Sequence, residues 1–177
     1  MNKTNDFLET YGNGMYEFIN NNYEKSVDIL SEAAKMDPDH KLTYVSRGSA
    51  YLKLDQLDEA LSDFNRAIDI DPTRADAYVG RANTLSTLGR YEEALPDYNR
   101  AIEIDPELAN AYANRGSAHS QTGQYEKAIA DYEKALELDP QIDDAPGFVK
   151  RLFSDEPKTE KGIRKHLEYL KQKVKDS

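Results

Sequence analysis

The amino-acid sequence predicts an all-α protein, an α-solenoid built from antiparallel helix pairs. The dipeptide Asp-Pro recurs every 34 residues, at positions 37–38, 71–72, 105–106 and 139–140. When residues 73–106 are aligned on 107–140 without gaps, 15 of 34 positions are identical. Each interval also contains two apolar stripes with helical spacing. A fixed period of this length is typical of stacked supersecondary units.

Each interval divides into two helices. In residues 39–72 the first stripe consists of Tyr44, Ala50, Tyr51 and Leu54. The second stripe consists of Leu57, Ala60, Leu61, Phe64, Ala67 and Ile68. The same pattern predicts later repeats at 73–106 and 107–140. Residues 5–38 are predicted to form a degenerate first repeat.

A short polar turn separates the two helices of each pair. Gly89 and Gly123 mark this turn in the later repeats, where a helix C-cap needs a positive φ. Asp55 takes the same place in residues 39–72. The proline of each Asp-Pro has no N–H and restricts the residue before it, so the dipeptide ends each pair.

Small and large residues recur together at the same interval. Alanines stand 34 apart in two series, Ala60, Ala94 and Ala128, and Ala67, Ala101 and Ala135. Large aromatic residues follow in a third series, Phe64, Tyr98 and Tyr132. We expect the helices to approach closely at the alanines, with the aromatic rings filling the space beside them.

These residues resemble the tetratricopeptide repeat. The pattern Tyr44-x2-Arg47-Gly48-x2-Tyr51, followed by Ala60-x3-Phe64, Ala67 and Pro72, is similar to the pattern of that family. The next two repeats match through Tyr78, Arg81, Ala82, Ala94, Tyr98, Ala101 and Pro106, and through Tyr112, Arg115, Gly116, Ala128, Tyr132, Ala135 and Pro140. The resemblance covers residues 39–140 and implies a right-handed solenoid.

The first repeat departs from this pattern. It keeps Gly14, Tyr23, Ala33 and Pro38, but has Thr10 where the large aromatic belongs and Ser26 for the first alanine. Terminal repeats are expected to be atypical because one face has no neighbour.

Composition and charge exclude several classes of protein. The chain has 177 residues, of which 38% are hydrophobic and 32% charged, and 12 Tyr and five Phe at periodic positions argue against disorder. Without cysteine it forms no disulfide, thiolate metal site or Cys nucleophile. No stretch approaches 18 apolar residues, so we expect a soluble, cytoplasmic protein. The net charge of −10 disfavours nucleic acid and anionic membranes as partners.

In the tetratricopeptide family, first helices line a concave groove that holds a peptide or a partner's helix. Carried over by position, the resemblance predicts a groove lined by Leu42, Val45, Ser49, Lys53, Asp76, Val79, Asn83, Asn110, Asn114, Ser117 and Gln121. Asparagine side chains both donate and accept, so Asn83, Asn110 and Asn114 suit the backbone of an extended peptide. The alternative is that these Ser and Asn residues are merely solvated.

One subtype of the family grips the C-terminal carboxylate of cytosolic chaperones with Lys, Arg and Asn. The matching places here hold Val45, Ser49, Gly80, Asn110 and Asn114, which supply no cation. This pattern argues against a chaperone-carboxylate clamp. In the first repeat the groove face is apolar instead, with Leu8, Tyr11, Met15, Phe18 and Ile19.

Arginines recur on the first helices where the family usually has an apolar residue. Arg47, Arg81 and Arg115 could form a ladder that grips an anion, but an aspartate follows each arginine by 16 residues, at Asp63, Asp97 and Asp131. The first repeat lacks both members of the pair. We therefore interpret them as structural ion pairs between facing helices.

No catalytic or cofactor site is predicted. The three histidines, His40, His119 and His166, stand far apart and outside any metal-ligand spacing. There is no glycine-rich phosphate loop and no hydrolase or metalloprotease motif. We predict a protein that is not an enzyme and uses no cofactor or metal.

The segment after Pro140 departs from the repeat. Residues 141–154 are predicted to form a capping helix, because solenoids need their last apolar face covered. Residues 155–177 are predicted to form a loop and a basic amphipathic helix with Ile163, Leu167, Leu170 and Val174 on one side. From residue 150 onward nine basic and five acidic residues give +4, against −14 before it. This helix either caps its own solenoid or docks on a second copy.

Three functions fit the sequence. The first is a non-catalytic adaptor that binds a protein or peptide ligand in the groove. The second is a self-associating scaffold, a homo-oligomer formed through the C-terminal helix or the N-terminal repeat. The third is a small acidic secretion chaperone, a class that resembles this chain in size and repeat number.

Overall fold

A computed structural model describes residues 3–142 and 162–176. These residues form α-helices and no strand, so the predicted all-α solenoid fold is confirmed. The predicted capping helix at 141–154 lies outside the described residues except at its start, as does most of the loop predicted before residue 162.

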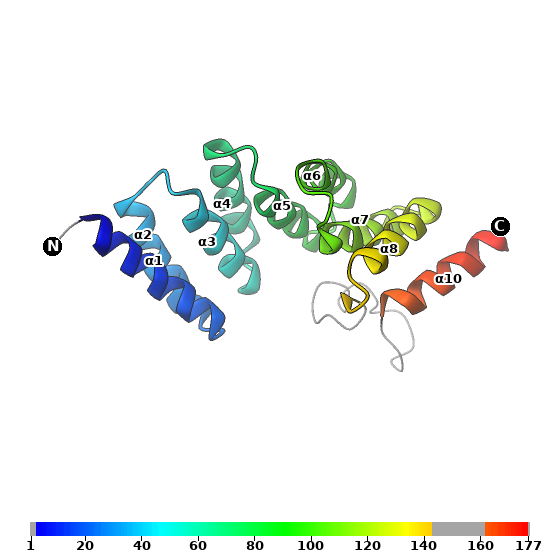
Figure 1. Ribbon diagram of the computed structural model, residues 1–177, viewed down its shortest axis with the longest axis horizontal. Coiled ribbons are helices and arrows are strands. Elements are labelled where there is room, and N and C mark those ends of the chain that lie inside the picture. Colours follow the sequence, from blue (N-terminus) through cyan, green and yellow to red (C-terminus); the bar gives the residue numbers. More distant parts are fainter. Residues whose placement is uncertain (1–2, 143–161, 177) are drawn as a thin grey trace. The chain divides into compact units, whose positions relative to one another are not determined.

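The chain divides into two compact units, Met1–Thr84 and Leu85–Ser177. The first unit contains α1 (Lys3–Ile19), α2 (Tyr23–Met36), α3 (Lys41–Lys53), α4 (Leu57–Ile70) and most of α5 (Ala75–Thr87). The second contains the end of α5, α6 (Tyr91–Ile104), α7 (Ala109–Gln121), α8 (Tyr125–Leu138) and α10 (Ile163–Lys175). Figure 1 labels these helices along the chain.

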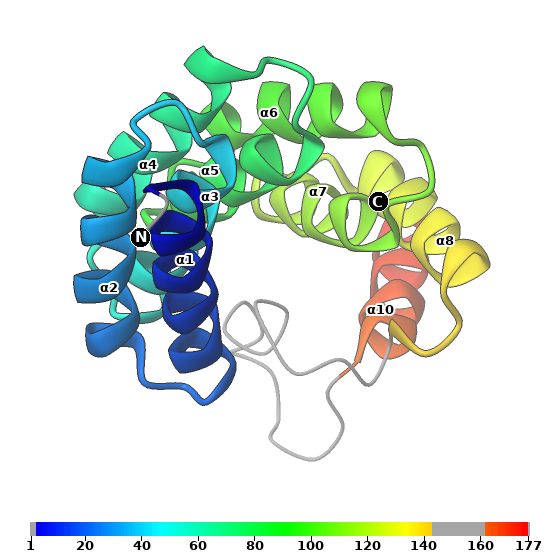
Figure 2. The ribbon, with the colours of Figure 1, turned by 60° about the vertical axis from the view of Figure 1, so that its left-hand side comes forward.

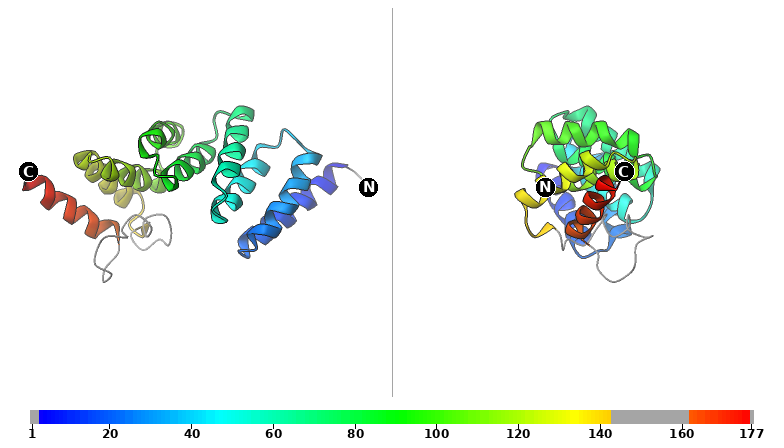
Figure 3. Two further views of the ribbon diagram at one scale, coloured as in Figure 1. Left: turned by 180° about the vertical axis from the view of Figure 1, so that it is seen from behind. Right: turned by 90° about the vertical axis from the view of Figure 1, so that its right-hand side faces the viewer.

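Within the first unit, α1 packs on α2 and α3 packs on α4, and the two pairs meet where α2 contacts α3. Figure 3 shows both pairs from behind, α1 and α2 in blue and α3 and α4 in cyan to teal. Within the second unit, α7 packs on α6 and α8, and α10 lies against α8 (Figure 2). A second helix therefore contacts the first helix of the following repeat in both units.

The turn between the two helices of each pair has the same backbone in every repeat. The positive φ predicted at Gly89 and Gly123 is confirmed, with φ of 74° and 76°. Asp55 has φ 61°, and Asn21, which the sequence pattern did not single out, has φ 62°. Asparagine and aspartate tolerate this conformation better than most residues with a side chain. All four turns therefore end the first helix in one way.

The aspartate of each Asp-Pro has a role of its own. Asp37, Asp71, Asp105 and Asp139 have extended backbones, and each side chain accepts a hydrogen bond from the backbone N–H two residues later. This contact is the Asx turn, in which a side chain imitates a backbone turn. Proline stops the helix, and aspartate folds the chain toward the next one.

The predicted packing of small against large residues is also confirmed. Phe64, Tyr98 and Tyr132 are 1%, 0% and 0% exposed, and the alanines of both series are fully buried. Gly80 on α5 lies directly against one of these rings. A Cβ on Gly80 would lie 2.2 Å from Cε1 of Phe64, so any side chain there would force the ring or the helix to move.

The C-terminal helix α10 covers the apolar face of the last helix pair. Its buried residues Ile163, Leu167 and Leu170 form one core cluster with Tyr132 and Ile142. Arg164 also donates to the backbone oxygen of Pro140 at 2.8 Å, next to the end of α8. In this structure α10 therefore caps its own chain.

Candidate functional site

The arginines of the first helices bridge neighbouring second helices. In the first unit, Arg47 donates from Nε and Nη2 to the two carboxylate oxygens of Asp63, at 2.8 and 2.7 Å. Its third nitrogen, Nη1, donates to Oγ of Ser31 on α2 at 3.0 Å. One side chain thus links a first helix to the second helix after it and to the second helix before it.

The second unit repeats this arrangement. Arg115 donates to Asp131 at 2.9 and 2.6 Å, and its Nη1 donates to Asn99 on α6 at 2.7 Å. Arg81 makes the backward contact to Asn65 at 2.7 Å. The aspartate that the sequence pairs with Arg81 is Asp97. It is buried, at 7% exposure, and belongs to the second unit, whereas Arg81 belongs to the first.

Burial affects the electrostatics of the Arg47–Asp63 pair. The Asp63 side chain is 6% exposed, and burial raises the pKa of its carboxyl against the opposing effect of Arg47. The hydrogen bonds to Asp63 raise the pKa of Arg47. A buried pair of this kind contributes little net stability, but removing one partner strands the other charge.

The predicted groove positions of the first unit differ in how open they are. Lys53 and Asp76 are exposed, whereas Leu42, Val45, Ser49 and Asn83 are half-buried. Val79 is buried, at 7% exposure. The first-helix face of this unit therefore offers six of its seven predicted positions to solvent.

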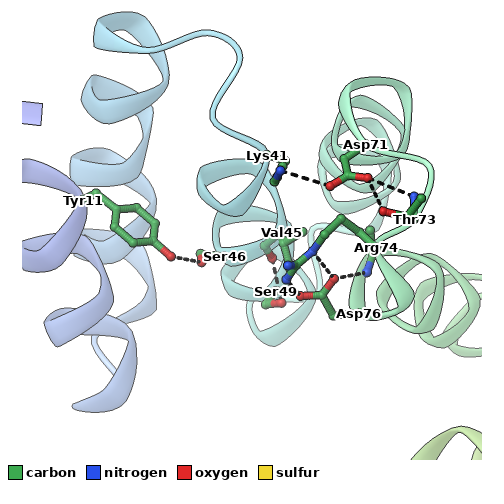
Figure 4. A network of polar contacts seen from close by, with 10 residues as sticks. Tyr11, Lys41, Val45, Ser46, Ser49, Asp71, Thr73, Arg74 and Asp76 are labelled. Atoms are coloured by element: carbon green, nitrogen blue, oxygen red, sulfur yellow. Dashed lines mark hydrogen bonds and ion pairs between the residues drawn. The ribbon is translucent and has the colours of Figure 1, made fainter. Parts of the chain in front are cut away.

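Polar side chains from α1, α3 and the start of α5 gather on this face (Figure 4). The hydroxyl of Tyr11 lies 3.4 Å from Oγ of Ser46. Arg74, directly before α5, donates from Nε to Oδ1 of Asp76 at 3.0 Å and forms a second contact with the other oxygen. The hydrogen bonds to Asp76 raise the pKa of Arg74.

Arg74 was missed by sequence reasoning. It precedes α5 by one residue, so the helical periodicity that selected the groove positions did not extend to it. Nearby, Lys41 lies 3.0 Å from Asp71. The hydrogen bonds from Thr73, followed by that from Lys41, lower the pKa of Asp71 to about 2.

An apolar stripe lies on α1 in the same unit. Leu8 and Ile19 are 56% and 73% exposed, with half-buried Tyr11 and Met15 between them along the helix. In chain order, these four residues stand 34 positions before the predicted groove residues Leu42, Val45, Ser49 and Lys53. A large exposed apolar side chain is informative when several share one face.

A different face of α1 carries a bulky residue. Tyr16 is 65% exposed, whereas its counterpart 34 residues later, Ala50, is 0% exposed. Glu9 is likewise exposed where its counterpart Thr43 is fully buried.

The predicted positions of the second unit are also unequal. Asn110 and Gln121 are exposed. Asn114 and Ser117 are buried, at 8% and 1% exposure, so they face the packing between helices rather than solvent.

The geometry of the described part of the chain also bears on metal sites and membrane spans. No group of three or more His, Cys, Asp or Glu side chains there could hold a metal ion. No helix among these residues has the length and apolar character needed to cross a membrane.

A family model described as tetratricopeptide repeat matches residues 42–107 and 73–141. Together these matches span more than half of the 177 residues. The chain belongs to the tetratricopeptide repeat family. No curated protein matches the chain.

Solved structures share the tetratricopeptide fold. MamA from Desulfovibrio magneticus RS-1 has a TM-score of 0.76 at 22% identity, covering 97% of this chain and 87% of that one. YrrB, described as a TPR protein with an unusual peptide-binding site, has a TM-score of 0.65 at 20% identity, covering 81% and 78%.

A third structure contains a ligand. The first TPR of Spaghetti (RPAP3), bound to the HSP90 peptide SRMEEVD, has a TM-score of 0.63 at 25% identity. That alignment covers 76% of this tetratricopeptide chain and 93% of the other. Repeat proteins of this kind generally use extended surfaces to bind other proteins.

Proposed function

We propose that this chain is a non-catalytic adaptor that binds a peptide or a partner's segment on the first-helix face of its repeats. The solved structures of the RPAP3 repeat bound to its peptide and of YrrB support this proposal at the level of the fold. The observation that carries it is the face shared by α1, α3 and the start of α5 in the first unit. There, exposed apolar side chains stand beside hydrogen-bonding groups that keep part of their surface in solvent.

This face combines two kinds of contact. Leu8 and Ile19 on α1 offer exposed apolar surface, and burying such surface against a ligand is favourable. Ser49 and Asn83 on α3 and α5 offer small polar groups suited to a peptide backbone. The side chains of Arg74 and Asp76 are 32% and 44% exposed, so both remain accessible to a ligand's charges.

In the second unit we place the ligand contacts at Asn110 and Gln121, which are exposed. The burial of Asn114 and Ser117 argues for a packing role for those two residues. We assign the arginine–aspartate pairs a structural role, because their hydrogen bonds are directed at neighbouring helices rather than outward. The net charge of −10 favours a protein ligand over nucleic acid.

The test is a selection of binders from a random peptide library on the immobilised chain, followed by calorimetric titration of the selected peptides. Ser49→Arg/Asn83→Arg should weaken their binding at least about tenfold, which corresponds to about 1.4 kcal/mol. Ser62→Lys, on the exposed side of α4, is the matched control and should bind as wild type does. Equal binding by all three proteins, with helix content unchanged, would exclude the first-helix face.

Self-association is the second candidate function. Leu8 and Ile19 are among the few large apolar side chains exposed on the described residues, and both lie on α1. Sedimentation equilibrium over a hundredfold concentration range tests this idea. A mass that rises with concentration, and returns to the monomer in Leu8→Lys/Ile19→Lys, supports it. A wild-type chain that stays monomeric removes it.

A further inference from the structure

Charge is divided unevenly between the first and second helices of the repeats. The first helix α3 contains three basic residues and no acidic one, and α7 contains one arginine and no Asp or Glu. The second helices α4 and α6 each contain four acidic residues and one basic residue. In a chain with a net charge of −10, the first helix α3 is therefore a basic element.

Arg74, directly before α5, adds a positioned cation to the first-helix face of the first unit. Its Nε donates to Oδ1 of Asp76 at 3.0 Å, and its Nη2 contacts Oδ2 (Figure 4). This two-point contact fixes the plane of the guanidinium, which has five N–H donors in all. Its third nitrogen, Nη1, forms no hydrogen bond with the residues that the structure describes, and the side chain is 32% exposed. Both N–H groups of Nη1 are therefore available to a ligand.

The acids nearest to Arg74 already accept several hydrogen bonds each. Asp76 accepts from Arg74 and from the backbone N–H that follows it, at 2.9 Å. Asp71 accepts from the backbone N–H and the hydroxyl of Thr73, at 3.0 and 2.6 Å, and lies 3.0 Å from Lys41. On this side of the face the carboxylates are well satisfied, while donors of Arg74 are left over.

Arg74 also lies within electrostatic range of α1. Its pKa is raised by the hydrogen bonds to Asp76 and, to a smaller extent, by Asp71 and by Tyr11 on α1. Tyr11 is part of the apolar stripe between Leu8 and Ile19. A ligand that lies across this face can therefore reach the guanidinium and the apolar stripe together.

The acids of α1 do not make this face negative. Glu17 is paired with Lys25 at 2.5 Å, and its side chain is only 10% exposed. Glu9 lies on the other face of α1, away from the apolar stripe. Asp6, at the start of α1, is balanced by Lys53 on α3, which is exposed and has no ion pair with the described residues.

We propose that Arg74 determines the charge of the ligand, so that the segment bound on the first-helix face of the first unit is an acidic peptide with an apolar side chain. A carboxylate of this peptide accepts hydrogen bonds from Nη1 of Arg74, and its apolar side chain packs on the stripe of α1. This inference rests on the proposed function. It does not reproduce the chaperone-carboxylate clamp, whose places supply no cation here. The acidic second helices disfavour the same peptide on the opposite face, which adds to the selectivity.

Selection from short synthetic random peptides with free C-termini, on the immobilised full chain, tests the inference. The peptides retained by wild type should be richer in Asp and Glu than the starting library. Arg74→Gln should lose most of this enrichment while still retaining peptides. Arg90→Gln is the matched control and should keep the enrichment, because Arg90 also lies directly before a helix and donates to an acid of its first turn, but that helix is the second helix α6.

Calorimetric titration of one retained peptide then locates the contact. Replacing its Asp and Glu by Asn and Gln should weaken binding at least about fivefold in wild type and less than about twofold in Arg74→Gln. A peptide amidated at its C-terminus is titrated in parallel. Loss on side-chain replacement assigns the carboxylate to a side chain, and loss on amidation assigns it to the C-terminus. Either loss supports the inference, provided that it disappears in Arg74→Gln.

Two outcomes overturn this inference and leave the proposed function standing. One is a wild-type pool that is no richer in Asp and Glu than the starting library, and the other is an enrichment that survives in Arg74→Gln. In both cases the retained peptides are still lost in Ser49→Arg/Asn83→Arg. A wild-type chain that retains no peptide, or peptides that bind Ser49→Arg/Asn83→Arg equally well, contradicts the proposed function itself and removes this inference with it.

Discussion

Nζ of Lys171 on α10 lies 2.7 Å from Oε1 of Glu133 on α8, and Glu133 stands 34 residues after Asn99 on α6. Asn99 accepts the backward hydrogen bond of Arg115 from the following first helix. The equivalent acceptors on α4 and α2 are Asn65 and Ser31. The C-terminal helix thus contacts the last repeat through the position that each repeat uses to hold the next first helix.

The first prediction separates the polar and apolar parts of this contact. Lys171 and Glu133 are 45% and 53% exposed, so Lys171→Ala should cost less than about 1 kcal/mol. Leu170 is 0% exposed, and Leu170→Ala should cost about 2–5 kcal/mol of α10 docking. Hydrogen exchange of α10 measures both. Similar costs for the two variants would mean that the ion pair, not the apolar seam, holds the helix.

The second prediction compares two glycines in the first unit. A Cβ on Gly80 would meet Phe64 at 2.2 Å, so Gly80→Ala should destabilise by about 1–3 kcal/mol. A Cβ on Gly12, within α1, would meet nothing within 4 Å. Gly12→Ala should therefore stabilise by about 0.5–1 kcal/mol through helix propensity. Urea denaturation followed by circular dichroism gives both signs, and a loss of stability in Gly12→Ala would refute the comparison.

A third prediction concerns Arg47 and Asp63. Because the Asp63 side chain is 6% exposed, Arg47→Leu strands a buried carboxylate and should cost about 3 kcal/mol. Asp63→Leu should cost a similar amount. The double variant should lose clearly less than the sum, since no charge is left unpaired. A double-mutant cycle by denaturation checks this, and additive losses would show that the two residues act independently.

A fourth prediction follows from the lowered pKa of His119. The unfolded chain binds a proton at the ordinary value of 6.5, and the folded chain binds it only at lower pH. The contribution of His119 is therefore complete above pH 6.5 and is lost as the pH falls toward the lowered folded value. His119→Leu, which introduces the residue found at Leu85, should gain stability relative to wild type at pH 5.5 more than at pH 8. Thermal denaturation at both pH values decides, and an equal gain at both would rule out titration.

The fold could be predicted from the sequence because each feature that repeats has a direct physical cause. Each of the three repeats from residue 39 onward contains a positive-φ turn, a stopping proline and a ring packed beside alanines, and these features depend on local chemistry that a sequence displays directly. Asn21 shows the limit of reading by residue type alone. It adopts the turn conformation of Gly89 without being glycine, and only its distance of 34 from Asp55 could have indicated it.

The candidate site was less predictable. Helical periodicity indicates on which side of a helix a residue lies, but not how deeply neighbouring helices bury its side chain. Asn83 and Ser117 occupy equivalent positions, 34 residues apart, on successive first helices, yet Asn83 is half-buried and Ser117 only 1% exposed. Side chains on neighbouring helices decide that difference. Arg74 was not predicted as a groove residue for another reason, because it lies in the turn before α5, outside the helical periodicity. The sequence also left the partner of α10 open, and the structure seats this helix on its own α8.

The contrast between Tyr16 and Ala50 bears on whether a second copy of the chain could stack on α1. Identical stacking contacts at both ends would let copies join into a fibre of unlimited length. Here α3 contacts α2 and its Ala50 is fully buried, whereas Tyr16 at the matching position of α1 is exposed, as is Glu9 where Thr43 is buried. A second helix from another copy would meet bulk and charge in that position. The exposed face of α1 therefore differs in shape and charge from the face of α3 that contacts α2.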